Sequence, residues 1–209
     1  ISETIKSDVN FLNSYCSNKP LFFKEQIEVL DPGTLLDTNK INNPWTKQLK
    51  GKRVLVVSSH EKTILKQWDN IENIWKGKTN EICPFELVGV VRSPFNPQID
   101  SRQYPNCGSW DQTLDYMKKL IDSYDYDVLL SGSAVFSPSL ADHAKKSGKI
   151  GITICGAIQL FFGILGSRWV NNQCFSEWRK LFNDNWIYPL EEDLPNNKSM
   201  FDSYEKAYW

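Results

Sequence analysis

The feature that most constrains the fold of this chain is the run from Asp127 to Trp169, in which apolar strands, small-residue turns and a helix alternate. Asp127–Leu130 predicts one buried strand and Ile150–Ile154 another, and each is followed by a turn that contains glycine. Alternating strands and helices predict a parallel sheet with right-handed crossovers. The loops after the strand carboxyl ends of such a sheet line the ligand crevice. Two such loops side by side therefore predict a binding site.

The rest of the chain extends this α/β pattern. The expected strands share short apolar runs rich in β-branched residues: Val54–Val57, Phe85–Val91, Asp127–Leu130 and Ile150–Ile154. The expected helices share apolar residues at helical spacing: His60–Trp75, a segment from an N-cap at Ser109 through Ile121, and Pro138–Ser147, which Gly148 ends. The fold class predicted is thus α/β, a Rossmann-like parallel sheet flanked by helices.

Length and local composition predict how the domain is bounded. At 209 residues the chain is expected to form a single domain with attachments. Residues 1–50 are polar and asparagine-rich, and they predict a helical and irregular appendage with a helix near Glu3–Tyr15. Residues 51–209 are expected to form the Rossmann-like domain, with an irregular aromatic tail after Trp169. Because the chain begins at Ile1 without Met, we expect further sequence upstream, including fused domains.

Charge and residue counts narrow the classes of function. The 24 basic and 25 acidic residues nearly balance, which disfavours nucleic-acid binding. No apolar run approaches the length needed to cross a bilayer. Five scattered cysteines predict free thiols in a reducing compartment, hence a cytoplasmic protein. With two histidines, a histidine-rich metal site is excluded, and no metal ligand is predicted.

Several motifs occur in an order that resembles a known group of proteins: Trp45-Thr46, Lys50–Val57, Ser109-Trp110, Asp127–Ser133, Gly148-Lys149, Gly156–Gln159, Phe162–Trp169, Asn183–Trp186, Pro195 and Tyr208-Trp209. This group comes from polysaccharide-synthesis loci and has a fold like that of the GT-D glycosyltransferases. The glycine-glutamine and arginine-tryptophan motifs are the most specific part of the resemblance, which spans roughly residues 45–209. It implies transfer of a sugar from a nucleotide-sugar donor to a glycan acceptor in glycan or capsule assembly.

One departure from that family concerns the metal. GT-D enzymes carry an Asp-x-Glu motif in a glycine-containing N-terminal segment, and this chain has no counterpart. The nearest acidic residues, Glu25 to Glu28 and Asp31, lack that context. Three alternatives stay open: the motif lies upstream of Ile1, this branch works without it, or the chain is not an active transferase. A need for Mn²⁺ or Mg²⁺ is left open in the same way. A second departure is Cys155-Gly156, where the family often has two glycines.

The candidate donor site lies in the loops after the first, third and fourth expected strands. Ser59 and His60 follow the first strand, and His60 is a candidate base for an acceptor hydroxyl or a contact for phosphate. Ser131-Gly132-Ser133 is either a diphosphate-binding loop or a tight turn. Gly156 precedes Gln159, whose amide is a candidate for contacting a base or a sugar hydroxyl, or else bonds to the backbone at a helix start.

Arg168 is the candidate cation for the departing nucleotide, because it follows two glycines and its guanidinium matches phosphate. The alternative is a structural pair with an internal carboxylate such as Asp127. The candidate acceptor side is aromatic and polar: Trp110, Trp169, Asn183 and Trp186. Core packing or covering of the sheet explains the same residues, and that reading is favoured for Trp209.

Three functions are compatible with these residues. The first is a glycosyltransferase that uses a nucleotide-sugar donor in polysaccharide biosynthesis, with Arg168 stabilising the departing charge. The second is a non-catalytic sugar- or nucleotide-binding module of a glycan-assembly protein. The third, a nucleotide-dependent oxidoreductase, is weakened because Ser58–Lys62 follows the first strand in place of a Gly-x-Gly-x-x-Gly motif.

Overall fold

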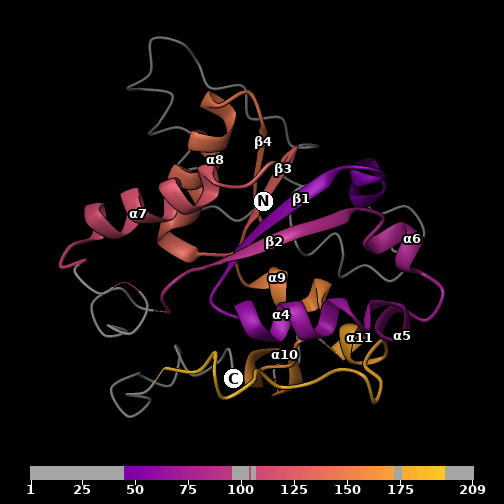
Figure 1. The fold of residues 1–209 in the computed structure, drawn as a ribbon. Coiled ribbons are helices and arrows are strands. Elements are labelled where there is room, and N and C mark those ends of the chain that lie inside the picture. Colours follow the sequence, from indigo (N-terminus) through magenta and orange to yellow (C-terminus); the bar gives the residue numbers. More distant parts are fainter. Residues whose placement is uncertain (1–44, 96–103, 105–106, 172–175, 196–209) are drawn as a thin grey trace, which may run out of the picture. The chain divides into compact units, whose positions relative to one another are not determined.

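The computed structural model describes residues 45–95, 104, 107–171 and 176–195 (Figure 1). The chain divides into two compact units, Ile1–Asp31 and Pro32–Trp209, and all the described residues belong to the second unit. The helix expected near Glu3–Tyr15, the acidic residues up to Asp31 and the final Tyr208-Trp209 lie outside the described residues.

A parallel sheet forms the centre of the described domain. Its strands share the apolar composition expected of buried parallel strands: β1 Arg53–Ser58, β2 Glu86–Arg92, β3 Val128–Ser131 and β4 Ile150–Thr153. They are ordered β2-β1-β3-β4, and all neighbours run parallel. In the centre Val56 pairs with Val90 on one side and with Leu130 on the other. The prediction of an α/β fold with a parallel sheet is therefore confirmed.

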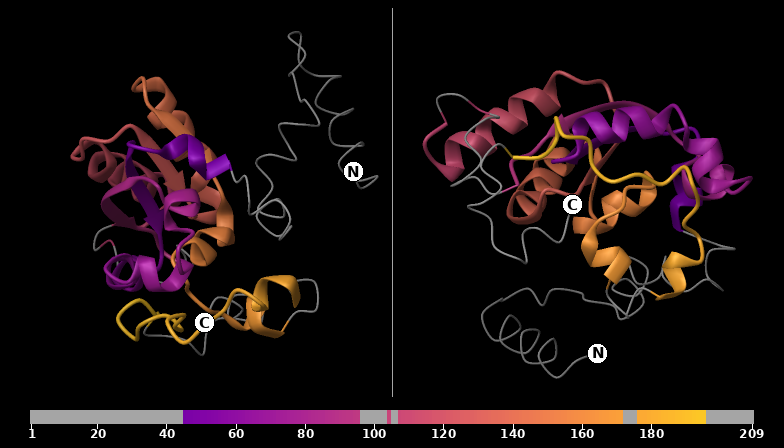
Figure 2. Two further views of the ribbon diagram at one scale, coloured as in Figure 1. Left: turned by 90° about the vertical axis from the view of Figure 1, so that its right-hand side faces the viewer. Right: turned by 90° about the horizontal axis from the view of Figure 1, so that it is seen from below.

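Helices cover both faces of this sheet (Figures 1 and 2). Two helices pack on one face: α7 Trp110–Asp122 and α8 Ser137–Lys146. The core on the other face includes residues of shorter elements: η1 Trp45–Leu49, α4 Glu61–Trp68, α5 Ile71–Trp75, α6 Thr79–Ile82, α9 Ile158–Phe161, α10 Ser167–Asn171 and α11 Ser176–Arg179. Two single turns follow strands: η2 Ala134–Phe136 after β3, and η3 Cys155–Ala157 after β4.

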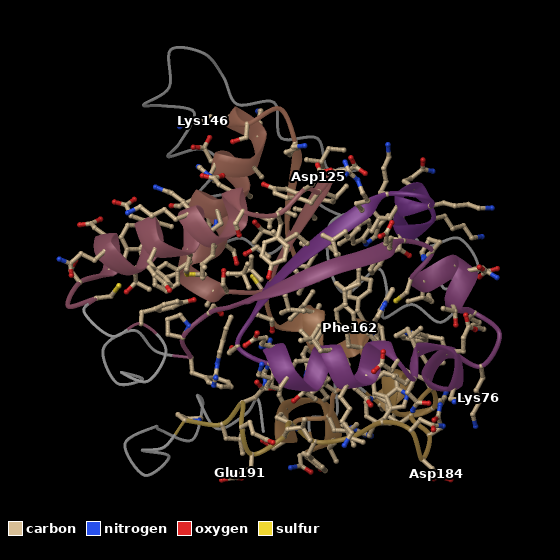
Figure 3. All side chains as sticks on the ribbon, in the orientation of Figure 1. Lys76, Asp125, Lys146, Phe162, Asp184 and Glu191 are labelled. Atoms are coloured by element: carbon tan, nitrogen blue, oxygen red, sulfur yellow. The ribbon has the colours of Figure 1, made fainter. Side chains whose placement is uncertain are left out.

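Two apolar cores follow from the alternation of side chains along each strand. Val54 and Val56 of β1 point into the larger core, together with Ile64 of α4 and the fully buried Phe162 (Figure 3). Leu55 points to the opposite core, with Val57, where it meets residues of α7 and α8. Leu49 of η1 belongs to the larger core, so residues 45–49 pack with the sheet.

The expected helix over His60–Trp75 is wrong in one respect, because the chain forms two helices there. α4 ends at Trp68, and Asn70 leaves helical geometry with φ −114° and ψ 12°. The Asn70 side-chain oxygen accepts from the Asn73 amide at 2.6 Å. Asp69 and Asn70 have lower helix propensity than most residues of α4, which favours a break after Trp68.

Two expected helix boundaries agree with the structure. The Ser109 hydroxyl accepts from the Gln112 backbone N–H at 3.3 Å, so Ser109 is the N-cap of α7. Gly148 follows α8 with φ +74°, the left-handed conformation that glycine adopts at low cost. None of the described helices is long and apolar enough to span a membrane.

Candidate functional site at the carboxyl edge of the sheet

The sheet order β2-β1-β3-β4 places a topological switch point between β1 and β3, where the loops after the two strands lead to opposite faces of the sheet. The chain leaves β1 to form α4 on one face, and it leaves β3 to form α8 on the other. Val57 pairs with Ser131, so the two strands end side by side. In open parallel sheets this position is where ligands bind. The structure therefore brings together the loops after β1, β3 and β4, as the sequence predicts.

The loop after β1 places Ser59 half-buried and His60 almost fully buried, at 3% exposure. The His60 backbone N–H donates to the Ser58 hydroxyl at 3.2 Å, and its carbonyl accepts from Ile64 at the start of α4. The edge of the imidazole meets Phe95, with ring centroids 5.2 Å apart. His60 thus lies beneath the surface of this edge.

The loop after β3 is held by a cluster of serine hydroxyls. Ser131 donates to Ser137 at 3.0 Å, and the Ser131 and Ser133 hydroxyls are 2.8 Å apart. The Ser133 backbone N–H donates to the Ser137 hydroxyl at 2.9 Å. All three serines are buried, so their hydroxyls act within the turn. The exposed part of this loop is Ala134–Val135, and Val135 is 63% exposed.

The loops after β3 and β4 are pressed against each other. A Cβ added to Gly132 would lie 2.4 Å from the Ile158 side chain and 2.8 Å from the Cys155 carbonyl oxygen, so only glycine fits there. Ala134 and Cys155 adopt φ +46° and +45°, which is costly for residues with a side chain. Lys76 is the other such residue among those described. Strained backbone of this kind is concentrated at functional sites.

Gln159 links the loops of β1 and β4 to the segment after α9. Its amide oxygen accepts from the Trp169 indole N–H at 2.9 Å, and its amide nitrogen lies 3.4 Å from His60 Nε2. Gln159 and Trp169 are 1% and 3% exposed. The structure thus brings three candidate residues together, but both ends of the Gln159 amide have protein partners. Gly156 is half-buried in η3, beside this group in the chain.

Arg168 is half-buried in α10, and its guanidinium carbon lies 5.1 Å from the centre of the Trp169 ring, within cation–π range. The alternative partner considered for it, Asp127, binds Arg53 instead. The Asp127 carboxylate accepts from the Arg53 backbone N–H at 2.9 Å and from Nη2 at 2.9 Å. These hydrogen bonds lower the pKa of Asp127 to about 2. This pair stands at the start of β1 and β3.

The candidate acceptor residues divide into two groups. Trp110 is 39% exposed at the start of α7, and its ring stacks on Phe136 with an interplanar angle of 5°. Trp186 is buried in the larger core against Trp75, with ring centroids 5.6 Å apart. Asn183 donates to the carbonyl of Ile74 at 2.9 Å. Asn183 and Trp186 therefore attach the C-terminal segment to α5, apart from Trp110.

Asp193 is the residue at this edge that the sequence interpretation missed. Its side chain is fully buried, and its carboxylate accepts from the backbone N–H groups of Lys62 and Thr63 at 3.0 and 2.7 Å. The Thr63 hydroxyl donates to the same carboxylate at 2.6 Å. The Asp193 and Glu192 carbonyls accept from Arg92 at the end of β2. The start of α4, where an anion would be favoured, already holds a carboxylate of the chain.

No sequence signal within α4 could have found this contact, because Asp193 lies 130 residues from Thr63. In the structure His60, the residue before α4, makes no side-chain cap hydrogen bond, and the Asp193 carboxylate accepts from the first turn instead. Within the described part of the chain, no group of three or more His, Cys, Asp or Glu side chains is arranged to hold a metal ion.

A shallow cavity of about 430 Å³ lies elsewhere, at the amino end of β4. It is lined by residues of α8 and the start of β4, with mixed charge: Ala141, Asp142, Lys145, Lys149, Ile150 and Gly151. Lys149 extends over the Tyr126 ring, 5.7 Å from its centre. No predicted site residue belongs to this cavity.

No protein-family model, no curated protein and no solved structure matches the chain.

Proposed function

We propose that this chain is a glycosyltransferase of the GT-D-like group, with a Rossmann-like domain that uses a nucleotide-sugar donor in polysaccharide synthesis. One observation carries the proposal: the two most specific motifs of the resemblance meet at the sheet edge where ligands are expected. Gln159 from the glycine-glutamine motif bonds to Trp169 from the arginine-tryptophan motif. The same glutamine approaches His60 after β1.

The donor diphosphate is proposed to bind at the loops after β3 and β4. Because Asp193 already fills the start of α4, a second anion there is disfavoured. Gly132, just before the exposed turn at Ala134–Val135, packs against Cys155 after β4, and Ala134 and Cys155 both have the strained backbone typical of ligand loops. Ser131 and Ser133 hold the loop after β3 through their contacts with Ser137, and Ser59 in the loop after β1 stays a candidate donor contact. Arg168 supplies the cation for the leaving diphosphate.

The acceptor glycan is proposed to contact Trp110, because this aromatic ring is partly exposed and held flat by Phe136. Aromatic faces suit the C–H surfaces of sugars.

Cys83, Cys107 and Cys155 are free thiols, which supports a reducing compartment such as the cytoplasm.

A second candidate is a sugar- or nucleotide-binding module without turnover. It is favoured by the lack of an Asp-x-Glu motif in this sequence. This candidate predicts the same ligand at the same loops, but no transfer of sugar.

A thermal-shift panel of UDP-, GDP-, CMP- and dTDP-sugars, with and without Mn²⁺, tests the proposal. A donor present at a hundred times its dissociation constant stabilises the folded chain by about 2.7 kcal/mol. We expect a shift with one nucleotide and its loss in Arg168→Ala. Lys145→Ala, at the cavity by the amino end of β4, is the matched loss of a cation and should keep the shift.

The two candidate functions separate in a transfer assay with the nucleotide sugar that binds. Release of the nucleoside phosphate coupled to glycosylation of an acceptor supports the transferase. Binding without release supports the module. Absence of any shift in folded protein contradicts both.

A further inference from the structure

Three buried side chains form a continuous hydrogen-bonded chain behind the carboxyl edge of the sheet. The Trp169 indole N–H meets the Gln159 amide oxygen at 2.9 Å, and the Gln159 amide nitrogen meets His60 Nε2 at 3.4 Å. None of the three residues is more than 3% exposed. Water therefore has little access to these groups, so each hydrogen bond between them needs a donor that faces an acceptor.

The chemistry of the two outer groups fixes the direction of every hydrogen bond. An indole N–H is a donor only, so the atom of Gln159 that faces Trp169 must be the amide oxygen. The amide nitrogen then faces His60, and an amide nitrogen also only donates. His60 Nε2 must therefore accept, which requires a lone pair on that nitrogen. In a neutral imidazole with a bare Nε2, the proton is on Nδ1.

We propose that Gln159 is a positioning residue, oriented by Trp169, that holds His60 as the neutral imidazole with its proton on Nδ1. Protonation of Nε2 would set two N–H donors against each other inside a buried site, which is unfavourable. The assignment is argued from the hydrogen bonds among these three side chains and applies whatever reaction the chain performs.

The assignment has a consequence for the transferase, and this part rests on the proposed function. Since the Nε2 lone pair is taken by Gln159, that nitrogen is not the base that removes the proton from an acceptor hydroxyl. His60 instead acts as a hydrogen-bond donor through Nδ1. Of the two roles considered for His60, this tautomer argues against the base, so contact with a ligand oxygen is the role left to test.

Nitrogen NMR of the full chain labelled with ¹⁵N-histidine tests the tautomer directly. The chain has two histidines, and His143 is assigned by its loss in His143→Gln. His143 Nε2 lies 2.7 Å from an Asp122 oxygen on the surface and is the internal reference. We expect a pyridine-like signal for His60 Nε2 and a pyrrole-like signal for Nδ1. A pyrrole-like Nε2 overturns the proposal.

Gln159→Glu should invert the pattern. A carboxylate oxygen accepts from Trp169, and the other oxygen faces His60, so Nε2 should now carry a proton. An unprotonated Nε2 in that variant contradicts the positioning role of Gln159.

Trp169→Phe keeps the aromatic packing and removes only the N–H that orients the amide. We expect the His60 signals to lose their single-tautomer pattern. Trp75→Phe removes another buried indole N–H, which donates to the Phe161 carbonyl at 2.9 Å, and it should leave His60 unchanged. Equal spectra for wild type and Trp169→Phe would remove Trp169 from the proposal.

These spectra are recorded without nucleotide, so they separate the tautomer from the function. The expected tautomer with no donor binding would reject the transferase and keep the assignment. Donor binding with the opposite tautomer would reject the assignment alone.

Discussion

The buried carboxylate of Asp193 offers the sharpest prediction about stability. It accepts two backbone N–H groups at the start of α4 and the Thr63 hydroxyl, at 2.6 to 3.0 Å. The Thr63 hydroxyl in turn accepts from the Leu190 N–H at 2.9 Å, so the C-terminal segment is fixed to α4 at two neighbouring points. Asp193→Ala removes the acceptor and leaves all three donors without it.

The expected cost of Asp193→Ala follows from these contacts. Each buried donor left without a partner costs about 1–3 kcal/mol. Loss of a negative charge at a helix start adds up to about 2 kcal/mol where it is partly buried. Some relaxation toward water reduces the sum, so we expect a loss of about 4 kcal/mol. Asp193→Asn keeps one acceptor oxygen but turns its NH2 group toward a former donor, so we expect a smaller loss of about 1–3 kcal/mol.

Urea unfolding followed by tryptophan fluorescence measures both variants. In thermal unfolding, the loss expected for Asp193→Ala corresponds to a fall of about 10 °C in Tm, given about 2–4 °C per kcal/mol for a chain of this size. Asp142→Ala is the matched control, because its carboxylate pairs with Lys146 on the exposed surface of α8, and it should be neutral. An Asp193→Ala variant as stable as wild type would refute the reasoning.

Three further predictions concern other parts of the domain. Hydrogen bonds from Arg53 lower the pKa of Asp127 from 3.8 to about 2, so the pair stabilises the folded chain above about pH 4 and stops doing so as the pH falls toward 2. The stability gap between wild type and Asp127→Asn, measured by urea unfolding, should shrink over that interval, and a constant gap would contradict the assignment. Gly132→Ala forces a Cβ into neighbours 2.4 and 2.8 Å away and should cost about 1–3 kcal/mol in the same assay, whereas Gly108→Ala, with no neighbour nearer than 3.7 Å, should not. Ser109→Ala removes the N-cap of α7 and should lower the unfolding free energy by about 1 kcal/mol; no change would mean that water replaces the cap.

The sheet could be predicted from the sequence because its signals are local. Val54–Val57 and Asp127–Leu130 are short, strongly apolar runs, and strands buried on both faces require such runs. Ser109 could be identified as an N-cap because its side chain bonds within the next turn. The loops of the candidate site followed from the strands, since parallel strands end at one edge.

The contacts that complete the candidate site could not be predicted, because they join distant residues. Gln159 and His60 are 99 positions apart, and Asp193 and Thr63 are 130 apart. A glutamine after a glycine turn gives no sign of whether its amide faces a ligand or a buried indole. That choice depends on where Trp169 packs, which is set by the larger core.

We propose that a nucleotide sugar binds at the loops after β3 and β4. Hydrogen–deuterium exchange of the full chain, with and without the donor that gives a thermal shift, tests this location most directly. We predict slower exchange at Gly132–Phe136 and Cys155–Gln159, and little change at Lys145–Gly151 by the cavity at the amino end of β4. Binding that protects Lys145–Gly151 and leaves the two loops unchanged would contradict it.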